Sequence, residues 1–303
     1  MTQSTWTVAD AQKLAFDAPV TDVRVRVVNG AVNVVGTDEE GPARLEVGRL
    51  EGPPLIVTHE DGVLTIAYED LTWKAFLKSP RLDRKAWQRT AEVTLTVPAG
   101  ARVELGAVGA TAVVSGVRGG TEVRGVSGDS TLVGLAGPVR ADTVSGNVEA
   151  QSVSGELRFH SVSGDLTVVD GTGGTVRADS VSGDMVLDLG PDPAGGPSEI
   201  TLTSVSGEVA IRLPHPADTR VEANTASGSV RTAFEDLRVT GQWGAKRMTG
   251  TLGSGNGTLK ASTVSGSIAL LRRPAAAADP FEAAGTAEPD APAAPPSLDK
   301  KVL

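Results

Sequence analysis

Apolar and polar positions alternate around regularly spaced glycines through the middle of the chain. Most of these glycines have an apolar residue two positions before them and others two and four positions after them, and the positions between are mostly Arg, Glu, Thr or Asn. Such alternation is typical of strands that bury one face, and the abundant valine suits a pleated surface. The pattern therefore predicts short strands that meet at glycine corners, and the corner residues are Gly128, Gly137, Gly146, Gly155, Gly164, Gly183, Gly207 and Gly266.

The spacing of the corners predicts how the strands stack. From Gly128 to Gly164 the glycines are nine residues apart, and the tetrapeptide Val-Ser-Gly-polar recurs around most of them. A nine-residue unit cannot bury its apolar face alone, whereas stacked units can. We therefore expect an all-β, single-domain solenoid resembling a parallel β-helix, in which two units form a coil of about 18 residues. At each corner, glycine is expected to supply a positive φ, and the neighbouring Ser, Asp and Asn to bond nearby backbone groups.

The first hundred residues alternate in the same way but with longer loops. Strands are expected at residues 22–28, 31–35, 43–47, 55–59, 63–68 and 91–97. Six of the ten aromatic residues lie in this part of the chain, which is typical of an end with a more globular core. Residues 1–100 are therefore predicted to form a strand-rich amino-terminal cap, continuous with the solenoid of residues 101–273. Residues 274–303 hold ten Ala and six Pro without such alternation, which predicts a disordered tail.

These motifs together resemble a known family. A G-x-V-x-V run from Gly30, the segment V-x-L-T-V-P-A-G-A at residues 93–101 and the ladder of V-S-G-D-L-type units are similar to the bacterial putative-adhesin β-repeat family of actinobacterial type, also called toastrack. The resemblance covers residues 6–271. It implies a single-sheet β-solenoid of unknown function whose relatives are often exported or membrane-tethered and associated with envelope stress. It implies no catalytic residues.

Composition and charge exclude several kinds of protein. The chain has no cysteine, which excludes disulfides, thiolate zinc sites and a cysteine nucleophile. Its net charge of −9 makes it a poor general binder of nucleic acid, so no nucleic-acid partner is expected. The amino end has no basic segment followed by an apolar run, and no stretch is apolar enough to span a membrane. These features predict a cytoplasmic protein, with peripheral contact to a membrane as the alternative.

The residues argue against two candidate chemistries, calcium binding and hydrolysis by a nucleophilic serine. The polar residue after each corner glycine varies, as in Asp165, Glu156 and Pro138, so Ca²⁺ ligands would be incomplete, and we expect these side chains to accept backbone hydrogen bonds instead. The serines beside glycine have no G-x-S-x-G context, and His160 is expected only to face solvent on the outer side of its strand. The sequence therefore predicts no metal, no cofactor, no catalytic residue and no enzyme activity.

One segment, residues 71–90, reverses the acidic character of the chain. It combines bases with aromatic residues in a predicted loop, and the candidate interaction residues are Trp73, Lys74, Phe76, Lys78, Arg81, Arg84, Lys85, Trp87 and Arg89. The loop is expected either to plug the open end of the solenoid with its rings or to bind a protein partner or an anionic membrane surface.

The sequence as a whole predicts a non-catalytic β-repeat scaffold or adhesin-like binding module, because solenoids offer long regular surfaces. The alternative is a cytoplasmic regulatory component of an envelope-stress pathway that contacts a membrane-associated partner through residues 71–90. Neither the partner nor the oligomeric state follows from the sequence.

Overall fold

The computed structural model describes residues 3–69, 88–172, 174–191 and 195–273. The chain divides into two units, Met1–Arg273 and Pro274–Leu303, and all described residues belong to the first. These residues form strands and turns without an α-helix, which confirms the predicted all-β class. None of the described segments is a helix that could cross a membrane. The predicted tail and most of the predicted interaction loop lie outside the described residues.

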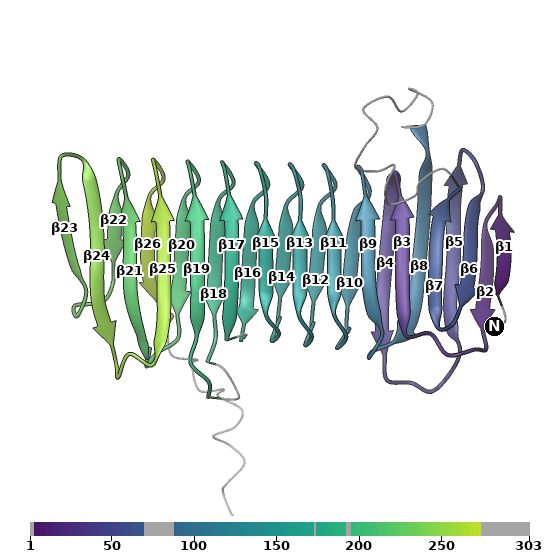
Figure 1. The fold of residues 1–303 in the computed structure, drawn as a ribbon, viewed down its shortest axis with the longest axis horizontal. Coiled ribbons are helices and arrows are strands. Elements are labelled where there is room, and N and C mark those ends of the chain that lie inside the picture. The colour runs from purple at the N-terminus through teal and green to yellow at the C-terminus, as the bar shows by residue number, and fades with distance from the viewer. Residues whose placement is uncertain (1–2, 70–87, 173, 192–194, 274–303) are drawn as a thin grey trace, which may run out of the picture. The chain divides into compact units, whose positions relative to one another are not determined.

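The strands form two sheets whose members lie side by side across the long axis of this unit (Figure 1). The first sheet contains 14 strands. In spatial order they are β1 (Ser4–Val8), β6 (Leu55–Glu60), β7 (Val63–Tyr68), β3 (Asp22–Val27), β9 (Arg102–Ala107), β11 (Thr121–Arg124), β13 (Val139–Asp142), β15 (Leu157–His160), β17 (Thr175–Ser180), β19 (Glu199–Ser204), β25 (Gly257–Thr263), β21 (Thr219–Thr225), β24 (Ala245–Leu252) and β23 (Arg238–Gln242).

The second sheet contains 12 strands. In spatial order they are β2 (Gln12–Phe16), β5 (Ala43–Glu51), β8 (Thr90–Pro98), β4 (Asn29–Thr37), β10 (Thr111–Ser115), β12 (Ser130–Val133), β14 (Val148–Gln151), β16 (Leu166–Gly171), β18 (Met185–Leu189), β20 (Val209–Leu213), β26 (Ile268–Arg272) and β22 (Val230–Thr232). Apolar side chains from both sheets form one continuous core.

From β9 to β20 the chain alternates between the two sheets, so each coil contributes one strand to each sheet. Strands of successive coils pair in parallel, with Val139 opposite Leu157 in one sheet and Val148 opposite Leu166 in the other. Both pairs are 18 residues apart, which confirms the β-solenoid and its two-unit coil. The single sheet implied by the family resemblance is wrong, because the chain turns at both corners of every coil and lines the core from two sides.

The corner glycines are required for a different reason than predicted. None of the eight has a positive φ, so that part of the prediction is wrong. Instead, a Cβ added to any of them would lie 1.9–2.2 Å from a backbone oxygen of the preceding coil, and for Gly164 that atom is the Gly146 carbonyl oxygen at 2.0 Å. The coils approach one another so closely at the corners that only a hydrogen fits on Cα.

The Val-Ser-Gly units fall into two classes, one at each corner of the coil. At one corner the apolar residue before Ser-Gly or Ala-Gly is buried, as in Leu135 and Val153. At the other corner the valine is 45–53% exposed, and these valines are Val144, Val162, Val181, Val205 and Val264. The nine-residue repeat therefore hides an alternation between a valine that packs in the core and one that faces solvent.

This alternation predicts opposite effects for the same substitution. Val153 is 3% exposed and Val162 is 49% exposed. We expect Val153→Ala to lower the free energy of unfolding by about 1–3 kcal/mol, because it removes buried methyl groups and leaves a gap. Val162→Ala should stay within about 0.5 kcal/mol of the parent. Urea unfolding followed by circular dichroism measures both, and equal losses at the two sites would contradict the assignment of corners.

The exposed-valine corner is held together by a repeated set of hydrogen bonds. The amide of Gly164 donates to Ser161 Oγ at 2.7 Å, and the hydroxyl of Ser163 donates to the Val144 carbonyl of the preceding coil at 3.3 Å. The amide of Asp165 donates to Asn147 Oδ1 at 3.0 Å, and Asp165 Oδ1 in turn accepts from the next coil. The polar residue after the glycine thus accepts a backbone hydrogen bond at these coils, as expected from the sequence.

The two ends depart from the simple stack. At the amino end the structure adds β1 and β2, which were not predicted, and Trp6 and Phe16 from these strands pack edge to face at 5.3 Å between ring centroids. At the other end β25 and β26 insert between the β19–β20 coil and the β21–β22 pair, although they come last in the sequence. The hairpin β23–β24 then closes the 14-stranded sheet.

Candidate binding surface

Two of the three histidines have different surroundings in the described structure. His59 is buried with its Nε2 3.3 Å from the Pro19 carbonyl oxygen, and His160 lies on the outer face of the 14-stranded sheet. No cluster of three or more His, Cys, Asp or Glu side chains suited to a metal ion occurs within the described ranges. The candidate functional sites of the described residues are therefore surfaces.

Of the nine candidate interaction residues, eight lie outside the described part of the chain: Trp73, Lys74, Phe76, Lys78, Arg81, Arg84, Lys85 and Trp87. Arg89 is described and lies just before β8. Its guanidinium lies over the Tyr68 ring at 5.2 Å from the centroid, and its carbonyl oxygen accepts hydrogen bonds from the amide and the side chain of Asn29, both at 3.2 Å. Arg89 thus has a structural role at the start of β8, and the function of the loop stays a prediction.

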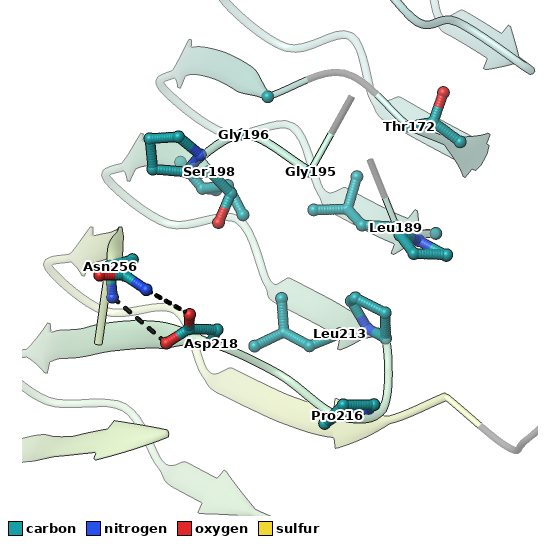
Figure 2. Close-up of a pocket in the computed structure, with 15 residues that line it drawn as sticks. Thr172, Leu189, Gly195, Gly196, Ser198, Leu213, Pro216, Asp218 and Asn256 are labelled. Atoms are coloured by element: carbon teal, nitrogen blue, oxygen red, sulfur yellow. Dashed lines mark hydrogen bonds between the residues drawn. The ribbon is translucent and has the colours of Figure 1, made fainter. Parts of the chain in front are cut away.

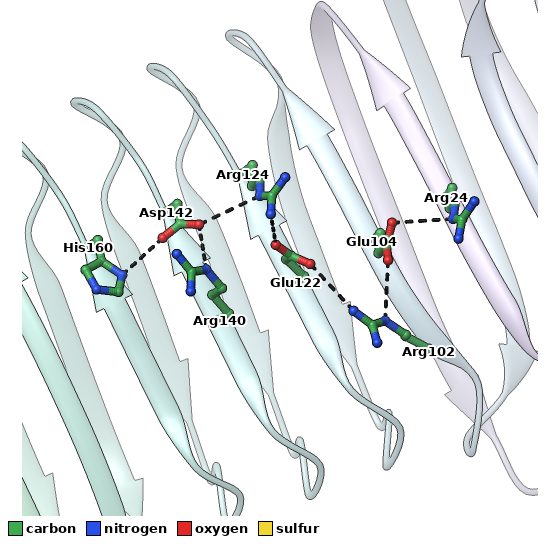
Figure 3. Close-up of polar contacts among 8 residues, drawn as sticks. All are labelled: Arg24, Arg102, Glu104, Glu122, Arg124, Arg140, Asp142 and His160. Atoms are coloured by element: carbon green, nitrogen blue, oxygen red, sulfur yellow. Dashed lines mark hydrogen bonds and ion pairs between the residues drawn. The ribbon is translucent and has the colours of Figure 1, made fainter. Parts of the chain in front are cut away.

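A network of alternating charges runs along the outer face of the 14-stranded sheet (Figure 3). Because outward residues of neighbouring strands align in register, each coil places its charged side chains beside those of the next. The contacts between neighbours include Arg24–Glu104 at 3.4 Å, Arg102–Glu104 at 3.4 Å, Arg102–Glu122 at 3.7 Å, Arg124–Asp142 at 3.7 Å and Arg140–Asp142 at 2.8 Å.

His160 is part of this network rather than merely solvated. Its Nδ1 lies 3.1 Å from Asp142 Oδ1, and its Nε2 lies 3.6 Å from Asp179 Oδ2 on the next strand. The expectation that His160 simply faces solvent is therefore wrong, because the strand register places a carboxylate on each side of the ring. The network spans β3 to β17 and fixes the orientation of side chains that would otherwise move freely on an exposed surface.

Three arginines form a row on the same face, and one of them, Arg140, belongs to the network. Arg140, Arg158 and Arg177 occupy aligned positions on β13, β15 and β17. Arg140 uses its Nε to bond Asp142 at 2.8 Å, and Arg158 uses its Nε to bond Glu156 at 2.7 Å, whereas Arg177 bonds Glu199 through Nη2 at 2.8 Å. The hydrogen bond to Asp142 raises the pKa of Arg140, so its charge is secure. The row presents one fixed guanidinium per coil.

A shallow hollow of about 220 Å³ lies beside this row. Its floor arises because the outward position held by Arg102 on β9 is occupied by Gly120 and then Pro138 on the next two coils, where no long side chain projects. Charged side chains surround the floor, and these are Arg102, Glu122, Arg140, Glu156 and Arg158. Three guanidinium groups face two carboxylates, so the rim has an excess of positive charge on a protein whose net charge is −9.

The outer face of the 12-stranded sheet has a different character. Its outward positions are rich in valine and threonine, and the half-exposed apolar residues there include Val35, Val113, Val186 and Leu271. The two broad faces of the solenoid are therefore chemically distinct, and the 14-stranded sheet offers most of the fixed hydrogen-bonding groups.

A larger pocket of about 490 Å³ lies near the turn that precedes β25 (Figure 2). Asp218 lines it, but both of its carboxylate oxygens are already engaged. Oδ1 accepts from the amides of Gly255 at 2.6 Å and Asn256 at 3.2 Å, and Oδ2 accepts from the Asn256 side chain at 2.7 Å. These bonds, the one from the Asn256 side chain first, hold the pKa of Asp218 below its usual range. Asp218 clamps the turn rather than offering a free acid.

The clamp predicts a pH-dependent effect. Because the folded state lowers the pKa of Asp218, its stabilising contribution is complete above the ordinary aspartate pKa of about 3.9 and disappears as the pH falls through the lower folded value. We expect Asp218→Ala to lower the melting temperature at pH 7 and to approach the parent value at the acid end of that range. The exposed Asp10→Ala serves as control and should track the parent at both pH values. A pH-independent deficit in Asp218→Ala would contradict the clamp.

Sequence analysis did not single out the arginine row, although a signal was present. Arg140 and Arg158 stand three positions after the corner glycines Gly137 and Gly155, and Arg177 stands three positions after Gly174. Other residue types hold this position at the corners between them, so a period of nine residues conceals the row. When the sequence is aligned with a period of 18 residues, Arg140 falls opposite Arg158. Trp243 at the β23–β24 turn was also overlooked, and it is 96% exposed.

The model of the Toastrack DUF4097 family matches residues 55–271. No curated protein matches the chain.

Solved structures that resemble the chain include a putative cell adhesion protein from Clostridium sporogenes (11% identity, 87% of this chain and 100% of that one, TM-score 0.27). Others are a putative lipid binding protein from Parabacteroides distasonis (12% identity, 87% and 97%, TM-score 0.39) and a putative adhesin from Bacteroides fragilis (13% identity, 89% and 97%, TM-score 0.35).

Proposed function

The chain belongs to the Toastrack DUF4097 family, and from that premise we propose that it is a non-catalytic binding module whose contact surface is the outer face of the 14-stranded sheet. The observation that supports this proposal most directly is the network of Figure 3, in which charged side chains from successive coils hold one another in fixed positions. Preorganised groups lose little conformational freedom on binding, which favours affinity for a macromolecule that spans several coils.

The open shape of the hollow and the pairing of its charged groups favour a binding role over a catalytic one. The hollow beside the arginine row is open and shallow, and its charged groups are paired in ion pairs rather than arranged as an acid, a base and a nucleophile. Exposed ion pairs of this kind contribute little to folding, about 0–1 kcal/mol each. A long network that stability does not require is consistent with a surface used for recognition.

The absence of cysteine from the chain allows a direct test. Thr203 on β19 is exposed on the proposed face, and Thr111 on β10 is exposed on the opposite sheet. We expect Thr203→Cys carrying a bulky polyethylene glycol maleimide to lose binding, because the polymer covers the charged network. Thr111→Cys with the same label should bind like the unlabelled parent, since its label covers the other face.

Binding is measured by biolayer interferometry against a defined panel. The panel comprises acidic and neutral polysaccharides, vesicles of anionic and zwitterionic lipid, and a second copy of the protein. Binding to one member, lost only with the Thr203 label, supports the proposal. Binding to no member, or equal loss with both labels, would overturn it. The regulatory alternative and the cytoplasmic location stay predictions, because they depend on residues 71–90 and on the place of the protein in the cell.

A further inference from the structure

We propose that the arginine row Arg140–Arg158–Arg177, with the adjacent hollow, binds an acidic polysaccharide that runs along the solenoid axis with one sugar ring per coil. This inference rests on the proposed function and names the ligand class of the same surface. The first observation that supports it is the alignment of the three arginines. The three arginines are aligned on neighbouring parallel strands, and each is held by a carboxylate next to it.

The spacing of the row favours a sugar chain over a peptide. Neighbouring strands lie about 4.8 Å apart, so the row offers one guanidinium at about that interval. This distance is comparable with the advance of an extended polysaccharide by one pyranose ring. In an extended peptide, side chains on the same face repeat only every two residues, or about 6.6 Å, so acidic side chains would fall out of step with the row.

The mixture of charges favours a ligand that both donates and accepts hydrogen bonds. In the part of the chain that the structure describes, Arg140 and Arg158 bond their carboxylates through Nε, so their terminal amino groups remain as donors for a ligand. Glu122 and Glu156 on the rim of the hollow are acceptors. A sugar carboxylate or sulfate suits the guanidinium groups, and ring hydroxyls suit the carboxylates. A simple polyanion would meet Glu122 and Glu156 with like charge.

The hollow supplies room for a ring. Gly120 and Pro138 leave its floor without long side chains over two coils, and Arg102 and Glu156 close its two ends. A ring lying on this floor would have Arg140 and Arg158 along one side. Beyond Arg158 the row continues with Arg177, which holds the aligned position on β17.

The test compares two matched oligosaccharides and two matched variants by isothermal titration calorimetry on the full chain. Hexagalacturonate carries one carboxylate per ring, and its methyl ester removes the charge while keeping the rings. The site variant combines Arg140→Gln, Arg158→Gln and Arg177→Gln. The control variant makes the same change in charge on the 12-stranded sheet, with Arg44→Gln, Arg212→Gln and Arg231→Gln. Melting curves establish that both variants are folded.

We expect hexagalacturonate to bind the parent, the ester to bind more weakly, and the site variant to lose about tenfold or more in affinity while the control variant changes by less than about twofold. Equal binding of the ester, or equal losses in the two variants, would overturn the inference. Tighter binding of poly-L-glutamate or polyphosphate would overturn it as well, since it would show recognition of charge alone.

The outcome is distinguishable from failure of the proposed function. If the Thr203 label blocks binding of a panel member that is not an acidic polysaccharide, while hexagalacturonate and the acidic polysaccharides do not bind, the proposed surface stands and its ligand class is wrong. If no member of the panel binds, the proposed function itself fails. A polysaccharide ligand would also argue against the cytoplasmic location predicted above, which cell fractionation tests independently.

Discussion

Replacing Gly164 with alanine is expected to destabilise the solenoid by more than about 3 kcal/mol or to prevent folding. The added Cβ would lie 2.0 Å from the Gly146 carbonyl oxygen and 2.8 Å from its carbon, both backbone atoms of the preceding coil. Backbone cannot move aside as a flexible side chain can, so the two coils must separate locally. Separation would also break the bond from the Asp165 amide to Asn147 Oδ1.

Two other glycines provide the comparison. An alanine Cβ at Gly100 would meet no atom within 4 Å, and the φ of Gly100 is not in the left-handed region, so Gly100→Ala should change stability by less than about 0.5 kcal/mol. Gly134 also has open space around it but a φ of +62°. Gly134→Ala should therefore lower the free energy of unfolding by about 1–2 kcal/mol, the cost of a left-handed backbone conformation for alanine. Chemical unfolding ranks the three variants. If Gly164→Ala were no worse than Gly134→Ala, close approach would not explain the corner glycines.

The repeat reveals the strands and the coil because both depend on local chemistry. Alternation around glycine placed predicted strands on β3 to β8 nearly as the structure has them, for example residues 63–68 for β7. The same nine-residue pattern did not reveal that Val153 is buried and Val162 is exposed, because both stand in the sequence Val-Ser-Gly. A motif of nine residues cannot distinguish two corners of an 18-residue coil, and burial at each corner depends on packing between the sheets.

The order of the last coils could not be predicted for a related reason. The unit at Val264 looks like all the others, yet it stacks on Val205, and the earlier unit at Ala226 stacks on it in turn. Every unit presents the same backbone donors and acceptors to its neighbours, so the motif does not specify which coil lies next. The intervening hairpin β23–β24 settles the order, because β24 pairs with β21 on the side opposite β25.

The candidate site was predictable only in outline. Composition directed attention to residues 71–90, whereas the charged network of Figure 3 uses single outward residues on many strands. Arg158 and Glu122 carry no signal by themselves. Their significance arises from the strand register, which aligns Glu122 with Arg140 and Arg140 with Arg158 on successive coils.

Replacing Phe159 with alanine is expected to lower the free energy of unfolding by about 3–5 kcal/mol. Phe159 is fully buried on β15, in a core built mostly from Val, Leu and Ala. Its neighbours in register are Ala141 on β13 and Ala178 on β17, both buried. The small neighbours make room for the ring, so its removal would leave three aligned alanines and a cavity that nearby side chains cannot fill. Urea unfolding at several wavelengths measures the loss.

A compensating substitution tests whether volume is the cause. In the parent, Ala178→Leu should destabilise by about 1–3 kcal/mol, because it crowds the ring of Phe159. In the Phe159→Ala background the same leucine can extend into the vacated space, so the double variant should be more stable than the sum of the single effects by about 0.5–3 kcal/mol. Additive losses would show that the cost of Phe159→Ala does not come from the space between the alanines. A positive coupling would establish that one large ring between two small neighbours is how this thin core is filled.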